Sequence, residues 1–162
     1  MDTFERFIQW IYSGLYNISE FETQAGADER YLQLAQLYTL ADKLRVRRLK
    51  NDIIDKVFEI KAKANRPPQI PTLSYVYGNS MEKSSFRKLM VAWYAWHIDF
   101  EWYSKEGTKD VLAENPEFTA DLAMILAKRL VNPHQLSPLV GEAHNYYEEA
   151  EDQENISQAN VQ

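Results

Sequence analysis

The stretch Tyr31–Ile60, YLQLAQLYTLADKLRVRRLKNDIIDKVFEI, decides the fold. Its first part repeats apolar side chains at three- and four-residue spacing, which is typical of one helix face. These side chains are Tyr31, Leu34, Ala35, Tyr38 and Ala41, broadened by Leu37, Leu40 and Leu44. A second seam contains Val46, Leu49, Ile53, Val57 and Ile60, with Ile54 and Phe58 beside it. Two such helices joined by a few residues predict a helical hairpin.

A further helix is predicted before this hairpin. Asp2 or Thr3 can cap it, and Gly14 is placed to end it in a left-handed turn. Helical spacing predicts one apolar face on this helix, made of Phe4, Phe7, Ile8, Ile11, Tyr12 and Leu15. The connector to the hairpin then follows, and we also consider a short strand at 15–18 within it.

Three prolines mark a boundary after the hairpin. Pro67, Pro68 and Pro71 lack backbone donors and cannot continue a helix. The helices expected beyond them are Thr72–Tyr77, the aromatic-rich Phe86–Tyr103, and Asn115–Val131 with its Asn-Pro-Glu start. Because Val91, Ile98 and Trp102 form a second apolar strip, we expect the aromatic helix to be sandwiched between neighbours.

The predicted fold class is therefore mainly α, with five to six helices and little or no strand. We expect three parts along the chain. Residues 1–64 contain the first helix and the hairpin, and residues 65–131 form a helical extension packed on them. Residues 132–162 are acidic and rich in amides, which predicts a disordered tail.

The net charge lies at the C-terminal end of the chain. The 162 residues have a formal charge of −6, and after Arg129 there are six acidic residues and no Lys or Arg. Residues 1–129 are consequently neutral and create no long-range field to attract nucleic acid. The longest apolar run, Leu89–Trp96, is much shorter than the ~20 residues of a membrane span. With no signal peptide in MDTFERF, we expect an intracellular protein, in the cytoplasm or nucleus, with no membrane contact.

The sequence lacks motifs for catalysis, cofactors and metals. There are no cysteines, and the five glycines are too scattered for a phosphate-binding loop. None of His97, His134 and His144 has a second His at metal-ligand spacing. His97 and Asp99 could be an acid–base pair, but residues two apart on a helix point away from each other. We expect His97 to lie in the core and the protein to have no enzyme activity, cofactor or metal.

Five basic residues lie within eight positions at the junction of the hairpin. They are Lys43, Arg45, Arg47, Arg48 and Lys50. In a helix-turn-helix protein they would contact nucleic-acid phosphates. Their place at a turn of a neutral body favours a solvated turn whose long side chains cover apolar neighbours. Nucleic-acid binding is therefore the weaker hypothesis.

Several short motifs follow one another in an order typical of a known family. In the first helix and the hairpin these are Ile11–Gly14, Leu34-Ala35, Tyr38, Leu40–Lys43 and Leu49-Lys50. The later motifs are Val76–Ser80, Ser84–Arg87, Trp93–His97 and Asn115–Phe118. The first set resembles the second half of a BTB/POZ domain. The second set resembles the helical region that follows this domain in many fungal BTB proteins.

The resemblance implies a non-enzymatic protein-interaction module, as an adaptor or scaffold. Domains of this family dimerise or bind partners, and some recruit cullin ubiquitin ligases. The implied partners are another copy, another BTB protein or a cullin. Cullin-binding members tend to have a hydrophobe-x-Glu at the first helix, whereas this chain has Phe4-Glu5-Arg6.

Because the match begins near residue 1, the chain corresponds to half of such a domain. The apolar faces of its first three helices must then find other surfaces, and we expect the first helix and the exposed side of the hairpin to contact a partner. The candidate contact residues are Phe4, Arg6, Phe7, Trp10 and Tyr12. The alternative is a truncated fragment with no function of its own.

Overall fold

The computed structural model describes residues 2–16, 18, 21–97, 100–131 and 140–148. These residues form eight α-helices and one 3-10 helix, and they contain no strand. The elements are α1 (Thr3–Ser13), α2 (Gln24–Lys43), α3 (Arg47–Ala64), α4 (Ile70–Asn79), α5 (Ser85–His97), α6 (Phe100–Ser104), α7 (Thr108–Glu114), α8 (Pro116–Val131) and η1 (Val140–Tyr146). The prediction of a mainly α fold is confirmed, although the helices outnumber the five to six expected.

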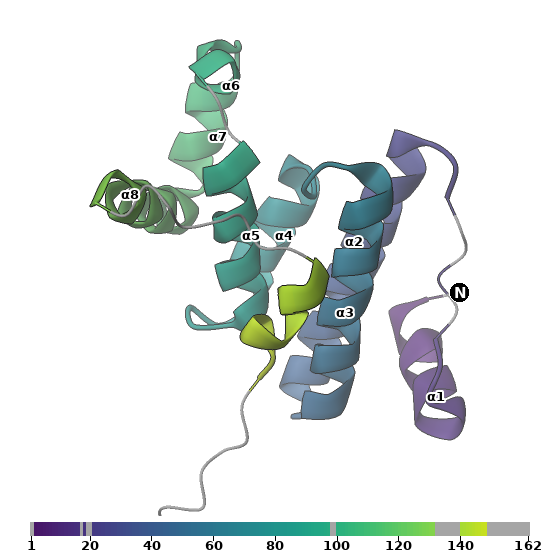
Figure 1. The fold of residues 1–162 in the computed structure, drawn as a ribbon. Helices are drawn as coiled ribbons and strands as arrows, with labels where there is room; N and C mark the ends of the chain where they lie inside the picture. The colour runs from purple at the N-terminus through teal and green to yellow at the C-terminus, as the bar shows by residue number, and fades with distance from the viewer. Residues whose placement is uncertain (1, 17, 19–20, 98–99, 132–139, 149–162) are drawn as a thin grey trace, which may run out of the picture.

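The predicted hairpin is α2 and α3, and it forms the centre of the molecule (Figure 1). Helix α2 begins at Gln24 because the Thr23 side chain accepts a hydrogen bond of 3.1 Å from the backbone N of Gly26. The two apolar seams are buried as predicted, including Tyr31, Leu34, Tyr38, Leu49, Ile53 and Val57. Leu40 and Val46 are half-buried, and Leu44 is exposed because it lies at the end of α2.

The turn between α2 and α3 is a tight helix-ending motif. The backbone N of Val46 donates to the carbonyl of Ala41 over 2.8 Å, and the N of Arg45 donates to Asp42 over 3.0 Å. This pattern needs a left-handed residue after the helix, a place usually filled by glycine. Here Arg45 fills it, with φ of 55°. The turn therefore holds a basic side chain at a backbone conformation that favours glycine.

The other helices lie on both sides of the hairpin (Figure 1). Helix α1 packs on α2 at one edge, and α4 and α5 cover the opposite side. Helix α8 packs on α5, and α6 and α7 connect these two helices at the end of the molecule. The 3-10 helix η1 lies across α3 and α5. Since Val91 on α5 is buried, the expected sandwich holds there, while Ile98 lies outside the described residues.

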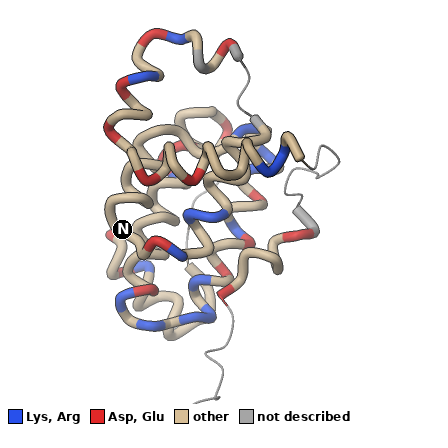
Figure 2. Tube along the Cα trace, turned by 90° about the vertical axis from the view of Figure 1, so that its left-hand side faces the viewer, with Lys and Arg blue, Asp and Glu red and all other residues tan. Residues whose placement is uncertain are grey.

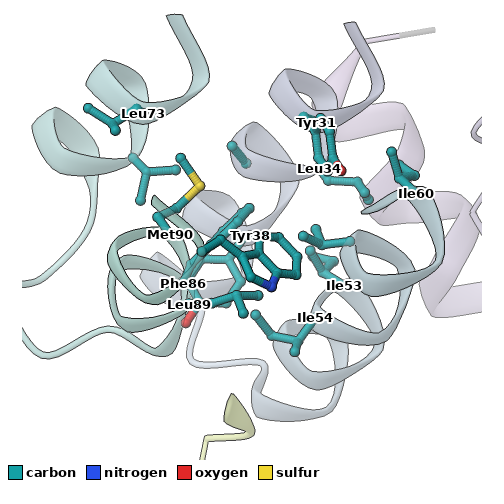
Figure 3. Packing of buried hydrophobic residues seen from close by; sticks show 14 of the residues in the cluster. Tyr31, Leu34, Tyr38, Ile53, Ile54, Ile60, Leu73, Phe86, Leu89 and Met90 are labelled. Atoms are coloured by element: carbon teal, nitrogen blue, oxygen red, sulfur yellow. The ribbon is translucent and has the colours of Figure 1, made fainter. Parts of the chain in front are cut away.

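Aromatic and aliphatic side chains from α2, α3, α4 and α5 meet in one core (Figure 3). Trp93 is fully buried, with its ring centroid 5.0 Å from that of Phe58. The ring of Tyr38 similarly meets that of Phe86, edge to face, at 5.2 Å. Such edge-to-face pairs are the favoured arrangement of aromatic rings. The aromatic helix thus supplies core packing, as its spacing predicts.

Arg87 joins α5 to two neighbouring helices from a position that is only 5% exposed. Its guanidinium donates to the carbonyls of Tyr77 and Ser80 at the end of α4, and it pairs with Glu117 at the start of α8. The Arg87 side chain also lies 4.7 Å from the centroid of the Tyr77 ring. A buried guanidinium is stable here because its donors are paired with carbonyl and carboxylate oxygens.

The helix expected at Phe86–Tyr103 corresponds to α5 and α6, and residues 98–99 between them lie outside the described residues. Helix α7 was not expected, and it begins after Gly107, which has φ of 83° and redirects the chain. The side chain of Thr108 donates to the carbonyl of Trp102 over 2.8 Å, which fixes the turn between α6 and α7.

The disorder expected for 132–162 does not hold for 140–148, which includes η1. Ala143 is buried, and the Tyr146 ring lies 6.0 Å from that of Phe58 on α3. These few side chains find partners in distant helices, which the low mean hydropathy of the segment does not reveal. Residues 132–139 and 149–162 lie outside the described residues.

Candidate protein-interaction surface

Helix α1 is fixed at its start by a reciprocal cap. The backbone N of Glu5 donates to the Asp2 carboxylate over 2.8 Å, and the N of Asp2 donates to the Glu5 carboxylate over 2.9 Å. At the other end, Gly14 has φ of 69° and its N donates to the carbonyl of Trp10 over 2.7 Å. Both ends of the helix are therefore satisfied locally, as the sequence predicts.

Trp10 in the C-terminal half of α1 and Tyr16 beyond its end connect the helix to the hairpin. The indole Nε1 of Trp10 donates to the Asp52 carboxylate of α3 over 2.9 Å. The Tyr16 hydroxyl donates to the backbone carbonyl of Asp52 over 3.1 Å. Burial, followed by the negative charge of Asp52, raises the pKa of Tyr16, so this hydroxyl keeps its proton. These bonds set which face of α1 points inward.

The inward face of α1 contains three of the predicted contact residues, Arg6, Phe7 and Trp10. Arg6 is 8% exposed and Phe7 is 7% exposed, and Trp10 is half-buried. Arg6 and Phe7 therefore support the packing of α1 on the molecule and are not available to a partner. Within the part of the chain that the structure describes, Arg6 Nε has no hydrogen-bond partner.

The outward face of α1 is apolar and open to solvent. Phe4 is 59% exposed, Ile11 52%, Tyr12 86%, and Leu15, just after the helix, 70%. We call these four residues the α1 outer face. Phe4 and Tyr12 belong to the predicted contact set, whereas Ile11 and Leu15 do not. All four belong to the apolar face predicted from helical spacing, so the sequence contained the signal for them.

In the basic cluster at the α2–α3 turn, one residue is largely buried and four are exposed. Lys50 is only 12% exposed and pairs with Asp42 at 2.7 Å. The other four, Lys43, Arg45, Arg47 and Arg48, are exposed and form no ion pair with a described acidic residue. We call these four the basic turn. Figure 2 shows Lys and Arg gathered at the lower end of the molecule, where this turn lies.

A small cavity of about 190 Å³ lies between α3, α2 and the connector after α1. It is lined by Ile18, Phe21, Arg30, Lys56, Glu59, Ile60 and Lys63. Lys56 pairs with Glu59 at 2.5 Å, Arg30 pairs with Glu29 at 3.1 Å, and Lys63 lies over the Phe21 ring. Since each cation already interacts with a protein group, the cavity offers no unpaired charge to an anionic ligand.

The described residues contain neither a metal-binding cluster nor a helix that could span a membrane. They contain no group of three or more His, Asp or Glu side chains that could hold a metal ion. None of the described helices combines the length and apolarity needed to cross a bilayer. The side chain of His97, and Asp99, predicted as a possible pair, lie outside what the structure describes.

Comparison with known proteins gives no relative to this chain. No family model, no curated protein and no solved structure matches it.

Proposed function

We propose that this chain is a non-enzymatic, intracellular protein-interaction module of BTB/POZ type, and that the α1 outer face contacts the partner. The observation that supports it is the exposure of Phe4, Ile11 and Tyr12 on α1, and of Leu15 just after it, while Trp10 and Tyr16 fix the helix to α3. Single exposed apolar residues are normal, but a contiguous apolar patch marks an interaction site. The order of BTB-like motifs supports the same class of function.

The geometry favours docking of α1 into a groove of the partner. An amphipathic helix binds a groove through apolar anchors spaced one and two turns apart. Phe4 and Ile11 lie two turns apart on α1 and provide such anchors, and the adjacent Tyr12 adds an aromatic ring with a polar end, which is typical of interface hot spots. Because α1 is already folded and held, binding costs little ordering entropy. The partner is therefore expected to be a protein, either a second copy or another BTB-type chain.

Site-specific photocrosslinking in living cells tests this proposal. Tyr12 is replaced by p-benzoylphenylalanine in the full chain, and Met81, which is 72% exposed on the α4–α5 connection, receives the same residue as a matched control. We expect a discrete crosslinked product from position 12 and none from position 81. Ile11→Glu should abolish the product. Equal crosslinking from both positions, or none from position 12, would refute the assignment of α1.

The basic turn favours a second candidate function, which is binding to nucleic acid. Its four exposed cations, Lys43, Arg45, Arg47 and Arg48, could contact phosphates. The turn lies between two helices whose apolar seams are buried, so neither helix is free to enter a groove as a recognition helix. Titration with a mixed-sequence duplex at low salt decides between the two. Binding that weakens steeply with added salt would support this candidate, and no binding would exclude it.

A further inference from the structure

The segment Val140–Glu148, which we call the strap, is held by other helices and not by its own turns. Its 3-10 helix, Val140–Tyr146, is seven residues long, whereas runs beyond three or four residues are uncommon because 3-10 hydrogen bonds have poor geometry. Contacts with α3 and α5 must therefore stabilise it. Ala143 is buried, and Tyr146 meets the ring of Phe58.

The carboxylate at the end of the strap is recognised by three helices. Oε1 of Glu148 accepts a hydrogen bond from the Tyr38 hydroxyl of α2. The same oxygen lies 3.4 Å from Nζ of Lys50 on α3 and 3.3 Å from the backbone N of Ser85 at the start of α5. The start of a helix favours a negative charge. These donors therefore form a built carboxylate site, which selects an acidic residue.

Two further groups recognise the residues next to that carboxylate. The Tyr147 hydroxyl donates to the Asp55 carboxylate over 2.5 Å, and the backbone N of Glu148 donates to the Asn51 side chain over 2.8 Å. Asn51 and Asp55 are four residues apart on α3, so they line one face of that helix. Together with Lys50, Tyr38 and the start of α5, this part of α3 contacts two aromatic side chains, Tyr146 and Tyr147, and the acidic residue that follows them.

We propose that this face is a peptide-binding site for segments with two aromatic residues followed by a carboxylate, and that the chain occupies it with its own strap. The occupant is the segment Val140–Glu148 itself, which satisfies every group described above. The site lies on α2, α3 and the start of α5, separate from the α1 outer face, and does not depend on the function proposed for α1. A peptide of the same sequence, supplied in solution, binds at the same place once the strap is released.

The first test measures binding of the free segment. A fluorescein-labelled peptide of residues 140–148, amidated at its end, is titrated with the full chain and with the variant Tyr147→Ala/Glu148→Ala, and binding is followed by anisotropy. In the wild type the attached strap competes at an effective concentration on the order of mM. We expect at least tenfold tighter binding to the variant. A peptide with Gln at position 148 should bind at least tenfold more weakly than the acidic peptide.

The second measurement covers the case in which that variant fails to fold. Hydrogen exchange is measured on the full-length wild type, with and without excess peptide, and on Glu148→Gln. Both the peptide and the substitution should increase exchange at the backbone N of Glu148 at least tenfold, while amides of α8 stay unchanged. Glu106→Gln, which removes the same charge from an exposed position, is the matched control and should have no effect.

Three outcomes would overturn the proposal. The first is equal affinity of the acidic peptide for the wild type and for a folded Tyr147→Ala/Glu148→Ala variant, or no binding to that folded variant. The second is equal affinity of the acidic and the Gln peptides, which would show that the carboxylate is not recognised. The third is an unchanged rate of hydrogen exchange at the backbone N of residue 148 in Glu148→Gln. This would show that the carboxylate does not hold the strap.

Discussion

The indole nitrogen of Trp10 donates a hydrogen bond of 2.9 Å to the carboxylate of Asp52, and so joins α1 to α3 across 42 residues of sequence. The backbone carbonyl of Asp52 also accepts from the Tyr16 hydroxyl. One residue of α3 thus holds both the C-terminal half of α1 and Tyr16, three residues beyond its end. The direction in which the α1 outer face points follows from this pairing.

Replacement of Asp52 should loosen α1 without unfolding the core. Asp52→Ala removes a part-buried carboxylate that accepts from Trp10, and we expect a loss of about 1–2 kcal/mol in the free energy of unfolding. Trp10→Phe should have a similar effect, because it removes the same donor. Urea denaturation of both variants and of the double variant measures their coupling. Fully additive losses would show that the hydrogen bond does not stabilise the fold.

Substitutions on the two faces of α1 should differ in their effect on stability. Tyr12→Ser and Ile11→Ser change exposed side chains and should alter stability by no more than about 0.5 kcal/mol. Phe7→Ala opens a cavity on the buried face and should cost about 3 kcal/mol. Thermal denaturation distinguishes the two sets. A large loss in Tyr12→Ser would mean that the outer face contributes to folding and not to a partner contact.

Glu148 should make stability depend on pH in the acid range. Burial raises its pKa, but the hydrogen bond from Tyr38 and the charge of Lys50 outweigh burial, so the pKa lies below its ordinary value of 4.5. A carboxylate whose pKa is lowered by folding stabilises the folded state at pH values above its pKa in the unfolded chain. This stabilisation is lost as the pH falls through its pKa in the folded state. At neutral pH, Glu148→Gln should lower Tm by roughly 2–4 °C, which corresponds to about 1 kcal/mol.

The same pair of proteins provides the control for this pH effect. Other carboxylates lie close to the strap, at Asp42 and Asp55, or within it, at Glu142, so the difference in Tm between wild type and variant is the relevant quantity. That difference should be constant between pH 6 and 8 and should shrink as the pH falls below about 4.5. A difference that stayed constant down to pH 3 would contradict the assigned role of the carboxylate.

Replacement of the buried Arg87 by lysine should destabilise the fold. Its planar group reaches the carbonyls of Tyr77 and Ser80 together with Glu117, and an ammonium group cannot match this geometry. We expect Arg87→Lys to lower the free energy of unfolding by about 2–3 kcal/mol. The neighbouring Lys88 is exposed, so Lys88→Arg is the control and should change little.

Glycine at the left-handed position of the α2–α3 turn should make the protein more stable. Arg45 has φ of 55°, a conformation that costs an ordinary residue about 1 kcal/mol. Arg45→Gly should therefore raise stability by about 0.5–1 kcal/mol, since glycine relieves the strain but loses more chain entropy on folding. Asn65 also has a left-handed φ, of 53°, but asparagine tolerates it. Asn65→Gly should have a smaller effect in the same denaturation measurement.

The hairpin could be predicted because its information is local. In α2 and α3 the apolar spacing, the cap and the short turn all favour the same structure, and side chains such as Leu34 and Ile53 are buried as expected. The inward side of α1 could not be predicted in this way. Apolar residues lie on both sides of α1, and its orientation is set by the Trp10–Asp52 bond between distant residues.

The strap was missed for a related reason. Low hydrophobicity and acidic charge indicate disorder when only the segment itself is considered. The side chains that hold it, Tyr38, Asn51 and Asp55, are 92 to 110 residues earlier in the chain. No local pattern reveals such a pairing, because each partner also fits a role in its own helix.

This long sequence separation has a kinetic consequence. The hairpin closes through residues near in sequence, whereas the Tyr38–Glu148 contact must close a loop of 110 residues, and contacts of high separation slow folding. We expect the strap to bind after the rate-limiting step. Its loss should then accelerate unfolding and leave the folding rate unchanged, because a contact absent from the transition state acts on the unfolding rate alone. In a chain made on the ribosome, the strap would be the last part to close.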